Sequence, residues 1–146
     1  MRIAVLDAAT LGNDLNLTLL SRFGSVECYP LTLPEQVKQR LADVECAIVN
    51  KVRLDRSTIG IGDAPQLKLI CIAATGYDNV DISYMKNRGI AVCNVVGYST
   101  DSVAQITLSM VLSLASHLKE YREFVASGSY SAAGAPNRLE PVYHEL

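Results

Sequence analysis

Short apolar runs alternate with stretches of helical spacing along the first 98 residues of the chain. The apolar runs predict strands at residues 3–6, 26–29, 47–49, 67–73 and 90–93. The intervening stretches predict helices at 13–23, 34–41, 55–61 and 81–87, with Gly24 and Pro34 as end signals. Strands that alternate with helices favour a parallel sheet. Right-handed crossovers then predict a flavodoxin-like, doubly wound α/β domain.

A much longer helical pattern follows at residues 102–126 and ends at Ser127-Gly128. Ser102 and Gln105 suit a capping box, and Ser99 or Thr100 is an alternative cap. Apolar residues recur at helical spacing: Val103, Ile106, Met110, Leu114, Leu118, Tyr121 and Val125. Other apolar residues cover much of the remaining surface: Leu108, Val111, Leu112 and Ala115. Such a helix must be buried by a further domain, a second subunit or both. Residues 129–146 have no regular period and are interpreted as a connector.

The composition is that of a globular protein, with 49% hydrophobic and 19% charged residues among 146. A formal net charge of -2 without basic runs argues against nucleic acid or an anionic membrane as partner. The longest apolar stretch, 103–118, is interrupted by polar residues and is too short to span a bilayer. With no secretory signal pattern, a soluble cytoplasmic protein is expected.

Four cysteines are widely spaced and form no C-x-x-C pair: Cys28, Cys46, Cys71 and Cys93. Each falls within or beside an apolar run. They are therefore interpreted as reduced core thiols and not as a metal or redox site.

The chain lacks the usual signals of dinucleotide binding and of acid–base catalysis. No G-x-G-x-x-G follows a predicted strand. The nearest match, Gly60-Ile61-Gly62, is followed by Asp63-Ala64-Pro65 where a helix should begin. Only His117 and His144 offer imidazoles, and both are interpreted as ordinary surface or interface residues.

Two segments follow predicted strands and carry the most specific pattern in the chain. Residues 73–81 read AATGYDNVD, and residues 94–105 read NVVGYSTDSVAQ. Small residues after a strand let backbone N–H groups approach an anion, and both strands are expected to end at one edge of the sheet. Lys51 emerges at the same edge, either to pair with a carboxylate or as a solvated loop residue.

These two segments, in this order, resemble the D-isomer-specific 2-hydroxyacid dehydrogenases, near the glycerate dehydrogenase or hydroxypyruvate reductase branch. The resemblance covers essentially the whole chain but only the front part of such an enzyme. It implies a substrate-binding domain at residues 1–98, and a crossover helix and connector at 99–146 that lead to an NAD-binding domain missing here. The full enzyme would transfer hydride between NAD(H) and a small 2-hydroxy or 2-keto acid. The family's catalytic Arg, Glu and His would lie beyond Leu146, so none is assigned in this chain.

The resemblance also implies roles for particular residues. Backbone N–H groups of Thr75 and Gly76, beside Ala74, would hold the substrate carboxylate; the alternative is a tight turn that needs Gly76 for its backbone angles. Tyr98 would line the active-site cleft. Three residues of the long helix would face the nicotinamide ring, although helix capping also explains the hydroxyls at its start: Thr100, Val103 and Thr107. The family often has His where this chain has Ile106.

We therefore expect no turnover from the 146-residue chain alone, and a homodimer formed through the long helix. Two other interpretations remain open. One is a non-catalytic interaction module on a dehydrogenase scaffold, and the other is a free-standing flavodoxin-like module that binds a carboxylate or a flavin. The exact 2-hydroxyacid and the preference for NAD or NADP are not set by these residues.

Overall fold

The computed structural model describes residues 1–132 and 134. The chain divides into two compact units, Met1–Tyr98 and Ser99–Leu146. The later residues of the connector, His144 among them, lie outside the described residues.

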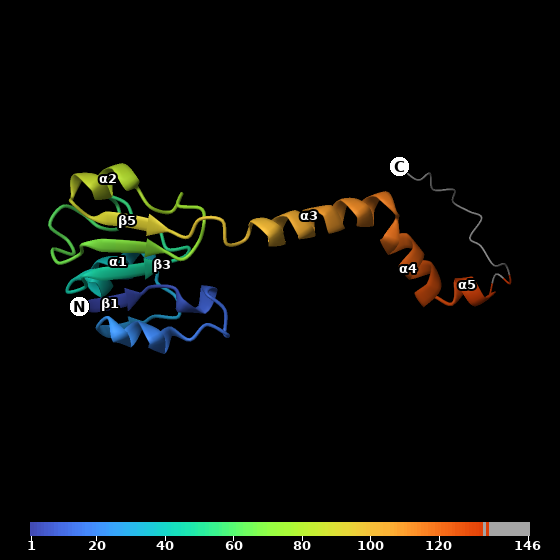
Figure 1. Ribbon diagram of the computed structural model, residues 1–146, viewed down its shortest axis with the longest axis horizontal. Helices are drawn as coiled ribbons and strands as arrows, with labels where there is room; N and C mark the ends of the chain where they lie inside the picture. Colours follow the sequence, from blue (N-terminus) through green and yellow to red (C-terminus); the bar gives the residue numbers. More distant parts are fainter. Residues whose placement is uncertain (133, 135–146) are drawn as a thin grey trace. The chain divides into compact units, whose positions relative to one another are not determined.

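The first unit is built on a five-stranded, all-parallel sheet (Figure 1). Its strands are β1 (Arg2–Val5), β2 (Ser25–Cys28), β3 (Cys46–Val49), β4 (Leu69–Ile72) and β5 (Ala91–Asn94). The strand order β2-β1-β3-β4-β5 is that of the flavodoxin-like doubly wound fold. This confirms the predicted fold class.

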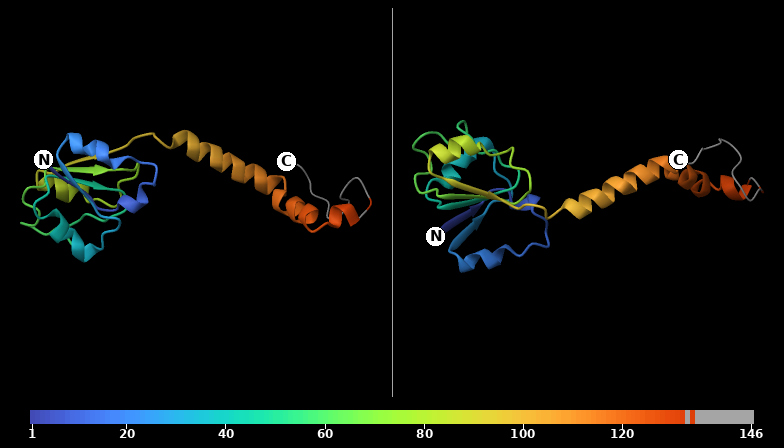
Figure 2. Two further views of the ribbon diagram at one scale, coloured as in Figure 1. Left: turned by 90° about the horizontal axis from the view of Figure 1, so that it is seen from below. Right: turned by 45° about the horizontal axis from the view of Figure 1, so that its top comes forward.

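Helices α1 (Pro34–Leu41) and α2 (Ile82–Asn87) pack on one face of this sheet. That face presents Ala4 of β1 and alternate residues of the neighbouring strands to the helices, and Val37, Leu41 and Met85 fill the space above them. Full burial of a Leu or Met side chain stabilises the fold by about 1.5–3 kcal/mol. The 3₁₀ helix η2 (Leu17–Arg22) lies on the opposite side of the sheet from α1 (Figure 2).

Local signals mark the starts of both helices, and Pro34 acts as the sequence predicts. Pro34 occupies the first turn of α1, and the Gln36 side chain accepts a hydrogen bond from the Leu33 N–H at 2.9 Å. The Asp81 carboxylate caps α2 by accepting the Tyr84 N–H at 2.9 Å.

Two predicted helices are wrong. Residues 13–23 contain only η2, preceded by the single 3₁₀ turn η1 (Ala8–Thr10). Asn16 caps η2 by accepting the Thr18 N–H. Asn side chains bond readily to nearby backbone groups, so Asn is more favourable at a helix cap than inside a helix. Residues 55–61 form a turn, in which the Asp55 carboxylate accepts the N–H groups of Ser57 and Thr58 at 2.8 and 3.2 Å.

The second unit contains α3 (Thr100–Ala115), α4 (Leu118–Ala126) and the short α5 (Ser129–Ala132). The prediction of one continuous helix at 102–126 is wrong. His117 adopts a left-handed conformation with φ 50° and interrupts the helix between α3 and α4. His is among the few residues that are enriched at positive φ. Ser99 is the N-cap of α3, as one alternative had it, without a side-chain capping bond. α5 occupies the start of a segment expected to be irregular.

The cysteines are not all core residues. Cys46 is buried and Cys71 is partly buried, whereas Cys28 and Cys93 are exposed. Their strands, β2 and β5, are the two edge strands of the sheet, where one side of the strand has no neighbour to cover it. The prediction of four core thiols is therefore wrong for two of them.

No helix among the described residues is long and apolar enough to cross a membrane. Within the same part of the chain, no cluster of three or more His, Cys, Asp or Glu side chains could hold a metal ion.

Candidate functional site

An open cavity of about 410 Å³ lies where the loops that follow β3 and β4 meet. This is the carboxyl edge of the parallel sheet, where open α/β sheets bind ligands. The cavity brings together three of the residues singled out from the sequence, namely Lys51, Ala74 and Gly76. Its other lining residues are Asn50, Arg53, Asp78 and Asn79.

The loop after β4 is held firmly by the segment after β5. The Val95 N–H donates to the Ala74 carbonyl at 3.1 Å, and the Asn94 side-chain amide donates to the Thr75 carbonyl at 2.7 Å. The Thr75 hydroxyl in turn donates to the Val95 carbonyl at 3.0 Å. These three bonds use the carbonyl groups and the hydroxyl of the loop and fix its backbone.

The N–H groups of Thr75 and Gly76 remain available. Over residues 1–132 and 134, no protein acceptor lies within hydrogen-bond range of either group. Both residues are exposed. Consecutive backbone N–H groups without internal partners form a ready site for an anion.

Glycine at position 76 is not required by the turn itself. The φ angle of Gly76 is not in the left-handed region, in contrast to that of Gly97, at 77°. A Cβ atom added at Gly76 would meet the Asp78 Oδ2 atom at 3.7 Å, an ordinary contact. A tight turn that needs glycine for its backbone angles is therefore not what the structure shows.

The loop after β3 is organised by a buried carboxylate that the sequence analysis did not single out. Asp7, 2% exposed, follows β1 and accepts the backbone N–H groups of Asn50, Lys51 and Val52 at 3.0, 2.5 and 3.1 Å. Charge-assisted bonds of this kind are stronger than neutral ones. They fix the backbone of Lys51 while leaving the residue exposed at the cavity.

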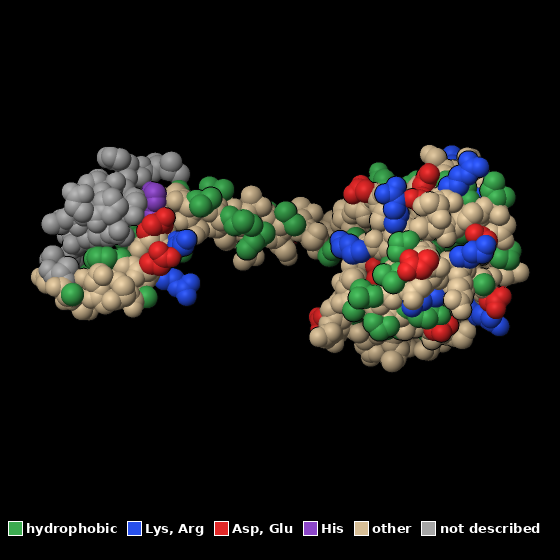
Figure 3. All heavy atoms as spheres, turned by 180° about the vertical axis from the view of Figure 1, so that it is seen from behind, with side chains coloured by type: hydrophobic (Ala, Val, Ile, Leu, Met, Phe, Trp, Pro, Cys, Tyr) green, Lys and Arg blue, Asp and Glu red, His purple; other side chains and the backbone are tan. Residues whose placement is uncertain are grey.

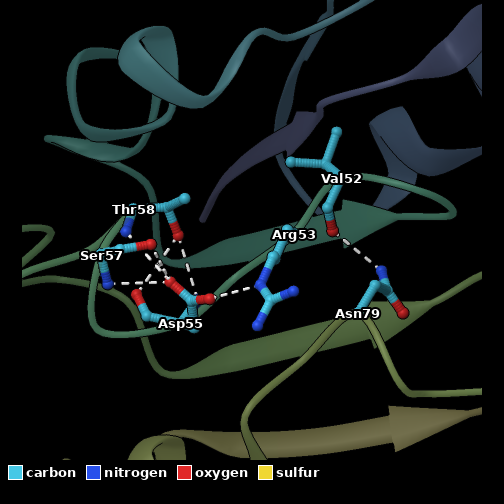
Figure 4. A network of polar contacts seen from close by, with 6 residues as sticks. All are labelled: Val52, Arg53, Asp55, Ser57, Thr58 and Asn79. Atoms are coloured by element: carbon cyan, nitrogen blue, oxygen red, sulfur yellow. Dashed lines mark hydrogen bonds and ion pairs between the residues drawn. The ribbon is translucent and has the colours of Figure 1, made fainter.

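Asn79 joins the two loops. Its side-chain amide donates to the Val52 carbonyl at 2.8 Å (Figure 4). A weaker bond joins the same amide to the Asn50 carbonyl at 3.5 Å. Next to it, Leu54 and Val80 form an isolated parallel bridge, and the Leu54 N–H donates to the Asn79 carbonyl at 2.8 Å. The two loops that form the cavity are thus hydrogen-bonded to each other as well as to the sheet.

Arg53, which lines the cavity, forms an ion pair with Asp55, 2.5 Å between Nε and Oδ2 (Figure 4). Hydrogen bonds from the Ser57 hydroxyl and from Arg53 hold the pKa of Asp55 well below its usual value. Arg53 also lines a neighbouring cavity of about 420 Å³. Lys51, by contrast, has no ion pair among the described residues.

A sequence model of the D-isomer specific 2-hydroxyacid dehydrogenases, catalytic domain, matches residues 3–140. The chain belongs to this family. It is 36% identical over 114 residues to a putative 2-hydroxyacid dehydrogenase of Haemophilus influenzae, which covers 78% of this chain and 36% of that protein. It is 30% identical over 136 residues to the hydroxypyruvate reductase of Blautia hydrogenotrophica, with 90% and 42% covered. This dehydrogenase-family chain thus spans less than half the length of these relatives.

Solved structures of other proteins share the fold of this chain. The D-lactate dehydrogenase of Aquifex aeolicus, solved with NAD and lactic acid, superposes with a TM-score of 0.74 at 22% identity. The match covers 99% of this family member and 41% of that chain. At this identity the likeness shows a shared fold.

The remaining predicted site residues of this dehydrogenase-family chain are exposed. Tyr98, 65% exposed, ends the first unit. Thr100, Val103 and Thr107 belong to α3 in the second unit, and the Thr107 hydroxyl donates to the Val103 carbonyl at 2.7 Å. Their roles toward substrate and nicotinamide stay predictions.

The described residues do not fit the main dinucleotide site of a dehydrogenase. Gly60 and Gly62 lie in turns, and the Gly60 N–H donates to the Asp63 carboxylate at 2.9 Å instead of pointing to a ligand. No strand of the described sheet leads into a glycine-rich helix start.

Asp7 and Asn79 hold the loops of the candidate site, and neither was singled out by its sequence pattern. The signal for Asp7 was an acid placed directly after an apolar strand, where a carboxylate must find hydrogen bonds once it is buried. Asn79 gave no such signal, because an Asn in a turn is usually explained by the turn.

Proposed function

We propose that residues 1–98 bind the carboxylate of a small D-2-hydroxyacid or 2-ketoacid of the glycerate/hydroxypyruvate kind, as the substrate-binding part of an NAD-dependent oxidoreductase. The observation that supports this proposal most directly is that the N–H groups of Thr75 and Gly76 have no hydrogen-bond acceptor among the described residues. They lie beside the open cavity that Lys51 lines. The names of the relatives, hydroxypyruvate reductase and glycerate dehydrogenase among them, support this substrate class.

In this proposal two backbone N–H groups donate to the carboxylate and fix its orientation. Lys51 adds attraction at the open side of the cavity, and the bonds from Asp7 keep its backbone in place. Orientation of this kind lowers the entropic cost of the later chemical step. Ala74 forms the neighbouring wall, and Tyr98 borders the cleft. In this proposal the residues named here bind and orient the substrate, and none of them is assigned to hydride or proton transfer.

For the 146-residue chain alone we propose no turnover, because its described residues provide no dinucleotide cradle. The test is NADH oxidation by the pure chain with hydroxypyruvate. Absorbance loss above a blank without protein would overturn this part of the proposal and leave the carboxylate site untouched.

Binding is tested by NMR titration of the chain with D-glycerate, and with glycerol as the control that lacks the carboxylate. We expect the amide signals of Thr75 and Gly76 to shift with glycerate and not with glycerol. Gly76→Pro removes one donor and should abolish the binding. Gly76→Ala keeps the N–H and has ordinary room for its Cβ, so it should retain binding. Equal binding by both variants would contradict the proposal.

A second function, self-association through α3, rests on a separate observation. Large apolar side chains along this helix are half or more exposed. Figure 3 shows hydrophobic side chains on the surface of the helical unit. They include Val103, Ile106, Leu108, Met110, Val111, Leu112 and Leu114. Exposed apolar patches of this kind mark interaction sites. A homodimer or a non-catalytic interaction module would both use this surface.

A further inference from the structure

Three cysteines occupy neighbouring strands on one face of the sheet. Cys71 of β4 pairs in register with Cys93 of β5 and with Ile48 of β3, two residues after Cys46. Since side chains alternate along a strand, Cys46, Cys71 and Cys93 all lie on the face opposite to the helices α1 and α2. Their exposure increases toward the edge: Cys46 is 4% exposed, Cys71 is partly buried and Cys93 is exposed.

Cys71 and Cys93 stand directly opposite one another. Register partners on neighbouring strands lie about 4.8 Å apart, which is within the Cα separation that a disulfide accepts. β5 is the edge strand of the described sheet and has a neighbour on one side only, so it can adjust to bring the two sulfur atoms together. Cys46 lies opposite Leu69 instead, one side-chain position away from Cys71 on that face.

The Cys46 thiol activates Cys71. A hydrogen bond from the Cys46 thiol to the Cys71 sulfur lowers the pKa of Cys71 to about 7. The same bond, together with burial, raises the pKa of Cys46, so Cys46 stays protonated and remains the donor. The thiolate is the nucleophilic form of cysteine, and a pKa close to the ambient pH gives the best attacking thiol.

We propose that Cys71 and Cys93 form a thiol-modification site for low-molecular-weight disulfides, with Cys71 as the attacking sulfur and Cys93 as the resolving one. The Cys71 thiolate attacks one sulfur of the disulfide R–S–S–R, forms a mixed disulfide and releases RS⁻, which takes up a proton. Cys93 then loses its proton to water and attacks the Cys71 sulfur. The Cys71–Cys93 disulfide forms and the second RS⁻ leaves and is protonated. Two protein thiols are oxidised and one small disulfide is reduced to two thiols.

This site does not depend on the proposed carboxylate binding, although it adjoins that loop. Cys93 precedes Asn94, whose side-chain amide holds the Thr75 carbonyl at 2.7 Å. The cross-link would therefore form at the base of the two segments that carry the loop.

The experiment treats the reduced 146-residue chain with glutathione disulfide and follows the products by mass spectrometry. Trypsin places the four cysteines in four different peptides, 23–38, 41–51, 69–86 and 89–119, so the linkage can be read directly. We expect a transient single glutathione adduct on peptide 69–86, followed by a disulfide that joins it to peptide 89–119. A link between peptides 41–51 and 69–86, or a stable adduct that never resolves, would overturn the proposal.

Three variants separate the roles. Cys93→Ser should trap the mixed disulfide on Cys71, and Cys46→Ala should move the pH at which Cys71 reacts half-maximally from about 7 toward the ordinary thiol value of about 8.5. Cys28→Ser is the matched control: Cys28 lies on the same face, is exposed and pairs with Val5, so its loss should change nothing. Circular dichroism checks that each variant is folded. Reaction of Cys28 as fast as that of Cys71 would contradict the assignment.

Discussion

At the scale of single residues, Asp7 explains why the proposed ligand site lies where it does. In flavodoxin-like sheets the crevice between β1 and β3 is the topological switch point, a natural place for an anion. Here the Asp7 carboxylate already accepts the three successive N–H groups after β3. The chain supplies its own anion at that crevice. The N–H groups of Thr75 and Gly76, which have no acceptor among the described residues, lie one strand further along, after β4.

We predict that Asp7→Asn destabilises the chain by about 2–3 kcal/mol, because the buried charge-assisted bonds are lost and the new amide N–H₂ meets backbone donors. Urea unfolding measures the change. Asp14→Asn is the control, since Asp14 is exposed and should shift the free energy of unfolding by less than about 0.5 kcal/mol. Similar losses in both variants would show that the Asp7 bonds contribute nothing specific.

The lowered pKa of Asp55 leads to a prediction about how the stability of the fold depends on pH. Its pKa is lower in the folded chain than in the unfolded one, where it is about 3.9, because the Ser57 hydroxyl and Arg53 stabilise the carboxylate. Its contribution to stability is therefore complete above that value and is lost as the pH falls through the folded-state pKa. Wild type should exceed Asp55→Asn in stability at neutral pH, and the difference should shrink below about pH 4. A difference that stays constant on acidification would exclude this linkage.

At the scale of elements, the two loops after β3 and β4 act as one structure because Asn79 spans them. Asn79→Ala removes the bond to the Val52 carbonyl, and we predict a loss of about 1 kcal/mol together with faster hydrogen exchange at the Leu54 N–H. Asn87→Ala is the control, an exposed Asn at the end of α2. If exchange at Leu54 were unchanged in Asn79→Ala, the loops would be held by the backbone bridge alone.

The individual strands, helices and turns differ in how far the sequence predicts them. The strands and α1 were predictable because continuous apolar runs and Pro34 report on burial and on a helix start directly. The turn at 55–61 was not, because its composition also suits a helix and the Asp55 bonds decide the conformation. The loop after β4 was singled out by its small residues, and its role toward a carboxylate stays a prediction. Asp7, 43 positions before Asn50, became part of the site only through the sheet topology.

At the scale of the whole molecule, the exposed surface of α3 predicts self-association of the chain. Ile106 and Met110 are 54% and 56% exposed and lie four residues apart, on one side of the helix. Two glutamates at these positions would place charges in an apolar contact, which strongly disfavours burial. We expect the wild-type chain to form dimers that increase with concentration in sedimentation equilibrium, and the Ile106→Glu/Met110→Glu variant to be monomeric.

The control adds the same two charges at the same spacing on polar positions of the same helix, as Gln105→Glu/Ser109→Glu. Both residues are exposed and belong to α3, so the change in net charge and in helix electrostatics is matched. If apolar burial holds the dimer, the control stays associated while the first variant dissociates. Equal dissociation of the two variants would mean that net charge, and not the apolar surface, governs association. A wild-type chain that stays monomeric at every concentration would remove the proposal of self-association altogether and leave carboxylate binding as the proposal for this chain.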